Sequence, residues 1–339
     1  MIAALLLVTV MVMAFFSTID RVAPEAGVVE ELAEFIAEQE LRHPLTGERL
    51  DQPYETLPQV FGVMVENSAD AWPLVGLDGA FLVIEAPVEG SIPRFIVFSS
   101  EESDIEKLGP VRSARPYYLD WNDELQGVYA HVGGSPEALD LIKYDYDTID
   151  LNQFWQSEYF YRQNGNRYAP HNVYTSSELL ISALDELELD PPTYSSWRFK
   201  DDSPIEDNAR SLKVDFTSGA TYDVDWDYNK ETNTYTRHQG RSVMKMEDRA
   251  TIEANNIIVL ATDIRVIDNV GRKQIKTVGE GDALIAQDGE VFLCRWKKDE
   301  RTDRLRFYTH DGFEISMNAG KTWIEVVDSL DQADPYDAE

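Results

Sequence analysis

Two arginines stand three positions apart in residues 109–116, a segment that reads GPVRSARP. Arg112 and Arg115 lie between glycine and proline residues, in a chain with 62 acidic and 30 basic side chains and a formal net charge of −32. Guanidinium groups offer rigid pairs of donors that match phosphate and carboxylate groups. Cations gathered in one turn-rich segment of so acidic a protein therefore predict an anion-binding site, to which Arg94 and Ser113 are added as candidate ligand-binding residues.

A set of internal ion pairs is the alternative to a ligand site. Arginines of an acidic protein find Glu and Asp partners, so both interpretations stay open for Arg112 and Arg115, and internal pairing is favoured for Arg94. Side chains three positions apart in an extended loop point to opposite sides. We therefore expect only one arginine of the pair to face a ligand.

Two further segments place polar side chains beside turn-forming residues, HVGGSPEA at residues 131–138 and RYAPHN at residues 167–172. Binding groups often lie in such loops on a rigid scaffold. Each histidine suits a general base, a phosphate donor or a metal ligand, and equally a half-buried structural histidine. The candidate binding residues in these segments are His131, Ser135, His171 and Asn172.

Other chemistries find little support. The histidines lack zinc-site spacing, the serines lack the Gly-x-Ser-x-Gly elbow of hydrolases, and the double glycine after His131 lacks the Lys-Ser/Thr ending of a phosphate loop. We predict no metal site and identify no cofactor. Four side chains are expected to meet in one cleft: Arg112, Arg115, His131 and His171. Nearby acids such as Glu85 would compensate their charge.

The three segments, in this order, resemble the YerB-like lipoprotein family of bacterial cell-envelope proteins. The resemblance extends upstream to HPLTG at residues 43–47 and VMVEN at residues 63–67, and it continues in the second half at residues 254–259, 279–283 and 320–324. It implies an envelope protein whose activity is unassigned and whose C-terminal domain is the smaller one. Typical members also carry a lipid-modified cysteine at the N-terminus.

A shorter resemblance connects SIPR at residues 91–94 and the segment at residues 129–137 with the LytR-CpsA-Psr phosphotransferases. Those enzymes attach glycopolymers to peptidoglycan from polyprenyl-pyrophosphate carriers, with arginines on the pyrophosphate and carboxylates on magnesium. Phe95 and Phe81 stand where that family has acids, so Asp78 would have to substitute. The resemblance implies a phosphotransferase or hydrolase acting on a lipid-linked or polymeric phosphate, or a related scaffold that binds without turnover.

Length and charge set the class of protein and of partner. The 339 residues are 43% hydrophobic, which is enough for a large core, and this length favours two domains over one. The acidity disfavours nucleic acid and anionic lipid headgroups through long-range repulsion, and it fits solubility in a saline habitat. The predicted partner is an anionic envelope ligand or an envelope protein, and not nucleic acid.

The N-terminus begins with an apolar run, residues 2–16, that only Thr9 interrupts. This length suits a signal-peptide core and is slightly short for a membrane span, with a buried core helix as the alternative. Residues 1–20 are interpreted as a signal peptide or membrane anchor. They predict an extracytoplasmic protein that meets the membrane through this segment only, or a secreted protein if the segment is cleaved. Residues 21–42 are expected to form a helical spacer or a docked surface helix.

Cys294 is the only cysteine, so no disulfide forms within the chain. It lies in an apolar, strand-like segment and is expected to be a small buried hydrophobic residue. Because no cysteine stands near the N-terminus for lipid modification, the apolar segment would provide the attachment, or the protein is released.

Residues 43–196 are expected to form an α/β domain, a mixed sheet with flanking helices. Strand-length apolar runs lie at residues 60–65, 81–85, 95–98 and 128–132. Helices are predicted to begin at Ser135 and near Ser176, because a serine precedes an acidic first turn at both positions.

A proline-rich stretch at residues 190–204 predicts a domain boundary near residue 196. Beyond it the helical spacing ends, so residues 197–330 are expected to form a smaller, mostly β domain, and residues 331–339 an acidic tail. The predicted strands of this second domain are residues 214–216, 220–226, 256–261 and 313–316.

Overall fold

The computed structural model describes residues 35–338 except 40, 164, 166, 217 and 218. The expected signal peptide or membrane anchor, residues 1–20, and most of the expected spacer lie outside the described residues. Within those residues, no helix combines the length and the apolar character needed to cross a membrane.

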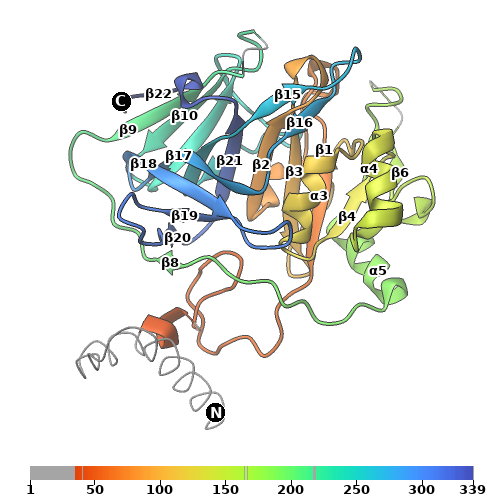
Figure 1. Ribbon diagram of the computed structural model, residues 1–339, viewed down its shortest axis with the longest axis horizontal. Coiled ribbons are helices and arrows are strands. Elements are labelled where there is room, and N and C mark those ends of the chain that lie inside the picture. The colour runs from red at the N-terminus through yellow and green to blue at the C-terminus, as the bar shows by residue number, and fades with distance from the viewer. Residues whose placement is uncertain (1–34, 40, 164, 166, 217–218, 339) are drawn as a thin grey trace.

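A large mixed sheet forms the centre of the molecule, and ten strands of the described chain contribute to it. Figure 1 shows orange strands from the first half beside blue strands from the second. β1 and β3 are buried along their whole length, as expected for strands covered on both faces. In spatial order the strands are β19 (Arg306–Tyr308), β18 (Glu290–Lys298), β17 (Gly279–Gln287), β14 (Asn256–Ala261), β21 (Thr322–Val327), β2 (Leu82–Pro87), β3 (Pro93–Ser100), β1 (Val60–Val65), β4 (Val128–His131) and β5 (Ile149–Asn152).

A second, antiparallel sheet packs on one face of the first. Burial alternates along its central strands, so one face lies on the core and the other meets solvent. Its strands are β12 (Ser242–Val243), β11 (Thr234–Gln239), β10 (Val224–Asn229), β9 (Arg210–Val214) and β22 (Ala333–Asp337), with β13 (Glu253–Ala254) beside β11. Three separate strand pairs complete the β structure: β15 (Ile264–Val266) with β16 (Lys273–Ile275), β20 (Met317–Asn318) with β8 (Phe199–Lys200), and β6 (Tyr161–Arg162) with β7 (Val173–Tyr174).

The three labelled helices lie beside the strands of the first half (Figure 1). They are α3 (Pro116–Asp123), α4 (Pro136–Asp140) and α5 (Ser177–Leu187), and a π-helical turn (Leu141–Asp145) extends α4. Both predicted helix starts are confirmed, because Ser135 accepts a hydrogen bond from the Ala138 amide and Ser176 accepts one from the Leu179 amide. Short 3₁₀ turns are η1 (Ala69–Ala71), η2 (Leu77–Gly79), η3 (Glu89–Ser91), η5 (Ser157–Tyr159) and η6 (Leu330–Gln332).

The expected fold class, a mixed α/β part followed by a mostly β part, is confirmed, with differences in detail. Residues 333–337 form the edge strand β22 on β9 and not an acidic tail. An edge strand tolerates Pro335, which has no amide to donate. Residues 313–316 form no regular strand, and β10 begins only at Val224 because a turn precedes it.

The two halves of the chain share one sheet and its cores. β2 pairs in parallel with β21, and Glu85 is opposite Glu325 in this register. Between the sheets, Phe61 and Val63 pack in the same cluster as Val224 and Trp226. On the other face, Cys294 is fully buried in a second cluster, as expected, and burial raises the pKa of its thiol to about 12.

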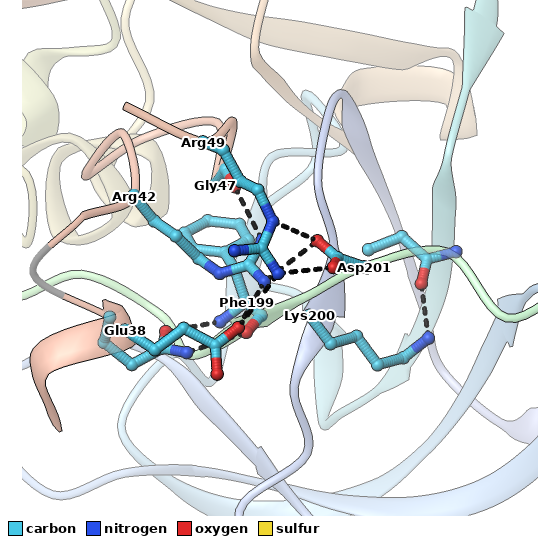
Figure 2. Close-up of polar contacts among 9 residues, drawn as sticks. Glu38, Arg42, Gly47, Arg49, Phe199, Lys200 and Asp201 are labelled. Atoms are coloured by element: carbon cyan, nitrogen blue, oxygen red, sulfur yellow. Dashed lines mark hydrogen bonds and ion pairs between the residues drawn. The ribbon is translucent and has the colours of Figure 1, made fainter. Parts of the chain in front are cut away.

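The end of the expected spacer docks on the second half (Figure 2). A short helix covers residues 35–39, and the Gln39 amide makes two 2.9 Å hydrogen bonds with the backbone of Phe199. Arg42 is buried and donates to Asp201 at 3.0 Å. Hydrogen bonds from Arg49 and Arg42 lower the pKa of Asp201 to about 2. Of the two expectations for residues 21–42, docking describes the part that the structure shows, residues 35–39, 41 and 42.

Neither half is expected to fold by itself. Residues 43–196 expressed alone lose β21 and expose an edge of β2, and residues 197–339 lose the partner of β21 in the same way. Each fragment should show no cooperative unfolding transition by circular dichroism, whereas co-expression should yield a complex that unfolds cooperatively. A cooperative transition in either isolated fragment would contradict the shared core.

Candidate functional site

One edge of the large sheet gathers most of the candidate residues. β1, β4 and β5 run parallel, and β2 ends at the same edge, where β3 begins with Pro93 and Arg94. Residues 109–116 cross this edge, since the Arg112 amide donates to the Met64 carbonyl at 2.8 Å and the Ala114 amide donates to the Gly133 carbonyl at 2.9 Å. Ligands commonly bind where parallel strands end.

Arg94 is a buried cation without a bonded counterion. Its side chain is 7% exposed, and its Nη1 donates to the Ser113 carbonyl at 2.8 Å. In the described chain, no carboxylate lies within ion-pair distance of it. Burial lowers the pKa of Arg94, and the charges of Arg115 and Arg112 lower it further. Such a group is costly unless an anion compensates it.

Arg115 is held by the protein itself. Its Nε and Nη2 bind the two carboxylate oxygens of Glu89 at 2.8 and 2.7 Å, and its Nη1 donates to the Ala114 carbonyl. Burial raises the pKa of Glu89, but the hydrogen bonds and charge of Arg115, together with the more distant charge of Arg94, outweigh it and leave that pKa below its usual value. Arg115 therefore anchors the loop to η3.

Arg112 points to another carboxylate and keeps its outer nitrogen atoms free. Its Nε lies 3.3 Å from Glu66 Oε1, and neither Nη atom has a hydrogen-bond partner among the residues described. Glu66 also accepts from Ser68 at 2.6 Å and lies 2.9 Å from His171 Nδ1. The side chains of Arg112 and His171 are 21% and 23% exposed, so both reach the surface.

Tyr129 adds a free hydroxyl to this edge. The side chain is fully buried on β4, and its hydroxyl makes no hydrogen bond of normal geometry. Burial raises the pKa of this hydroxyl well above 10, although the nearby charges of Arg94 and Arg115 and the Arg115 amide oppose the shift. A protonated phenol beside two guanidinium groups can donate to an anion. We name Arg94, Arg112, Arg115 and Tyr129 the arginine site.

Three predicted residues support this edge from within. His131 is fully buried between the Gly133 carbonyl and Asp150, each at 2.7 Å. Ser135 caps α4. The Asn172 side chain accepts from Arg162 at 3.0 Å. The structure thus joins His171 to Arg112 through Glu66, and it encloses His131 beneath the loop.

Glu85 belongs to a different cluster between the two sheets. Its Oε2 accepts from Arg237 at 2.6 Å, its Oε1 accepts from Asn67 at 3.1 Å, and Glu325 lies beside it. The side chains of Glu85, Arg237 and Glu325 are all fully buried. Burial and the charge of Glu85 raise the pKa of Glu325 well above its usual value. Glu325 Oε1 accepts from Trp226, whereas Oε2 has no donor. A proton on Glu325 Oε2 gives this oxygen a hydrogen-bond partner, because the protonated oxygen can donate to the carboxylate of Glu85.

Sequence reasoning did not single out Glu66, Tyr129, Arg237 or Glu325. Glu66 had a signal, since it directly follows an apolar strand within VMVEN. Among the residues that the structure describes, no group of three or more His, Cys, Asp or Glu side chains lies close enough to hold a metal ion.

Comparison with known proteins places this two-sheet architecture in a described family. Residues 45–190 match the N-terminal domain of a family described as "Protein of unknown function (DUF3048)", and residues 212–324 match its C-terminal domain. The chain belongs to this family. A Bacillus subtilis (strain 168) protein described as "Putative lipoprotein YerB" is 30% identical over 306 residues, 87% of this chain and 88% of that protein. The crystal structure of the YerB protein from Bacillus subtilis superposes with a TM-score of 0.77 at 29% identity, covering 87% of this chain and 99% of the other.

Glu325→Gln should remove a pH-dependent destabilisation. In the unfolded chain Glu325 loses its proton near pH 4.5, whereas the folded protein keeps it, so the wild-type free energy of unfolding falls by up to about 1.4 kcal/mol per pH unit above that pH. The variant should match the wild type near pH 4 and be more stable at pH 7 by about 1–3 kcal/mol. Urea unfolding at several pH values measures this, with the exposed Glu290→Gln as control. Equal destabilisation at every pH would show an ionised Glu325.

Tyr129→Phe should leave the free energy of unfolding unchanged to within about 0.5 kcal/mol, because the lost hydroxyl makes no hydrogen bond of normal geometry and only a weak contact with the Arg115 amide. Tyr118→Phe is the matched control: the Tyr118 hydroxyl lies 2.7 Å from the Arg94 carbonyl and 3.0 Å from the Ala86 carbonyl, and its loss should cost about 1 kcal/mol. Guanidinium unfolding of both variants tests the difference. A similar loss for both would mean that the Tyr129 hydroxyl is bonded within the protein.

Proposed function

We propose that this protein is an extracytoplasmic envelope protein that binds an anionic ligand at the arginine site. The observation that carries the proposal is Arg94, a guanidinium that is nine-tenths buried, has no bonded carboxylate in the described chain, and lies near two further arginines. The outer nitrogens of Arg112 and the hydroxyl of Tyr129 supply further free donors. Phosphate and carboxylate groups are the acceptors that such donors match.

The charge of the whole protein favours a compact anion over a long polyanion. A net charge of −32 repels anions at long range, but at physiological ionic strength this repulsion is screened beyond about 8 Å. Contacts within the arginine site are shorter than that distance and are less screened because the site is partly buried. Binding should therefore tolerate salt better than binding to a basic surface.

The location follows from two lines of support. The relative from Bacillus subtilis is described as "Putative lipoprotein YerB", and residues 1–20 of this chain have the composition of a signal peptide or anchor. Directly after the docked segment, His43 lies 2.9 Å from Glu102, just after the end of β3 that pairs with the start of β1, whereas the arginine site lies beyond the other end of β1. Six strand residues span about 20 Å. An anchored protein would then present the site away from the anchor.

A phosphotransferase like the LytR-CpsA-Psr enzymes is the second candidate, and the carboxylate of Glu89 beside Arg115 is the feature that favours it. Phe95, which stands where that family has an acid, is fully buried against Trp323. Asp78 precedes the start of β2 and so lies at the opposite edge of the sheet from Arg94. These positions favour binding without turnover.

Titration calorimetry with pyrophosphate, inorganic phosphate and citrate, each with and without Mg²⁺, tests the function. Arg112→Gln and Arg94→Met should each weaken binding of the preferred anion at least tenfold, since one hydrogen bond to a charged group contributes about 1.5–3 kcal/mol. Arg265→Gln is the control, because Arg265 is exposed on β15 and pairs with Asp263. Unchanged binding in both site variants, or no binding of any of these anions by the wild type, would refute the proposal.

A further inference from the structure

Two aromatic side chains stand exposed next to the arginine site. Phe154 is 62% exposed and Trp155 is 80% exposed, in the turn that follows β5. We name these two residues the aromatic patch. Large aromatic surfaces contribute most when buried, so leaving two adjacent rings in water gives up stability and marks a binding surface.

The turn that carries the aromatic patch is rigid. Asn152 is buried, and its side-chain oxygen accepts hydrogen bonds from the amides of Gly133 and Phe154, both at 3.2 Å. The Asn152 carbonyl accepts from the amide of Trp155 at 2.9 Å. The backbone below both rings is thus fixed before any ligand arrives, which lowers the entropy cost of binding.

The aromatic patch borders the loop that carries Arg112. The Phe154 ring packs over Gly133, where a Cβ atom would lie only 2.7 Å from it. The Gly133 carbonyl accepts from the Ala114 amide at 2.9 Å, and the Val132 amide donates to the Arg112 carbonyl at 3.0 Å. One ligand of modest size can therefore touch both the patch and the arginine site.

We propose that the ligand is a saccharide that carries a phosphate or carboxylate group, with its sugar rings on the aromatic patch and its anionic group at the arginine site. This inference rests on the proposed function. Sugar rings have apolar C–H faces that pack flat on aromatic rings, and hydroxyl groups that suit the exposed polar residue Ser157 beside the patch. A purely apolar partner would meet a polar border, and a polymer with closely spaced charges would meet the repulsion of an acidic protein.

The test compares anions with and without sugars by titration calorimetry. The probes are inorganic phosphate, glucose 1-phosphate, maltose 1-phosphate, digalacturonate, uncharged maltotriose and ADP. Wild-type protein should bind at least one charged saccharide more tightly than inorganic phosphate, by roughly three- to tenfold, as expected for stacking on an aromatic ring. The sugar phosphates and digalacturonate distinguish phosphate from carboxylate as the anionic group.

Trp155→Ala and Phe154→Ala should remove this gain and leave the affinity for inorganic phosphate within twofold. Phe313→Ala is the matched control, because Phe313 is 72% exposed in the second half of the chain and outside the aromatic patch. Arg112→Gln should weaken both kinds of ligand.

The other outcomes separate the two proposals. Binding of inorganic phosphate or pyrophosphate, with no gain from sugars and no effect of the aromatic variants, would overturn the saccharide and leave the anion site. Tighter binding of ADP that depends on Trp155 would replace the saccharide with a nucleotide. If uncharged maltotriose bound as tightly as the charged saccharides, the arginine site would not contribute to binding of the ligand. If no probe bound, both proposals would be overturned.

Discussion

The buried ion pair between Arg237 and Glu85, with Glu325 beside it, is the constraint on which the rest of the structure depends. Arg237 comes from the second sheet, and the two carboxyl groups come from the adjacent strands β2 and β21. Two carboxylates opposite each other would repel, so this strand pairing requires both the cation and the proton on Glu325. Loss of one partner would leave a buried charge uncompensated, at a cost of about 3–5 kcal/mol. The cluster therefore fixes the two halves of the chain in one register.

This constraint extends to the arginine site through neighbouring residues. Asn67, which bonds Glu85, also accepts from the indole of Trp72 at 2.9 Å. The residue before it, Glu66, receives Arg112 and His171. Of the two residues that follow β1, Glu66 therefore lies at the arginine site and Asn67 lies in the buried cluster. The position of Arg112 is consequently coupled to the joining of the two sheets.

The sequence predicted what depends on local pattern. Apolar runs identified β1 and β14 with their observed bounds, and serine caps identified the starts of α4 and α5. The pairing of β2 with β21 joins residues about 240 positions apart, and no local pattern encodes it. Arg237 lies within TYTRHQ, where a charged residue ordinarily marks the solvent side of a strand, so its burial could not be seen.

The same limit applies to the prediction of the candidate site. The RSAR segment drew attention to this edge, but spacing alone could not say which arginine is bonded internally. In the structure Arg115 holds the loop to Glu89 through both carboxylate oxygens, while Arg112 uses one nitrogen on Glu66 and keeps two free. Arg115 therefore positions the loop, whereas Arg112 faces outward.

Arg94 gives the strongest argument for a ligand because the rest of the protein makes it an exception. In a chain with 62 acidic residues, buried cations such as Arg237 and Lys298 are paired with buried carboxylates, each at 2.6 Å. Arg94 is buried to a similar degree, yet within the described residues it bonds only to a carbonyl. Burial without a bonded counterion costs stability, and so many acids were available to supply one. The proposed anionic ligand would supply the counterion that Arg94 lacks and so offset the free-energy cost of burying its charge.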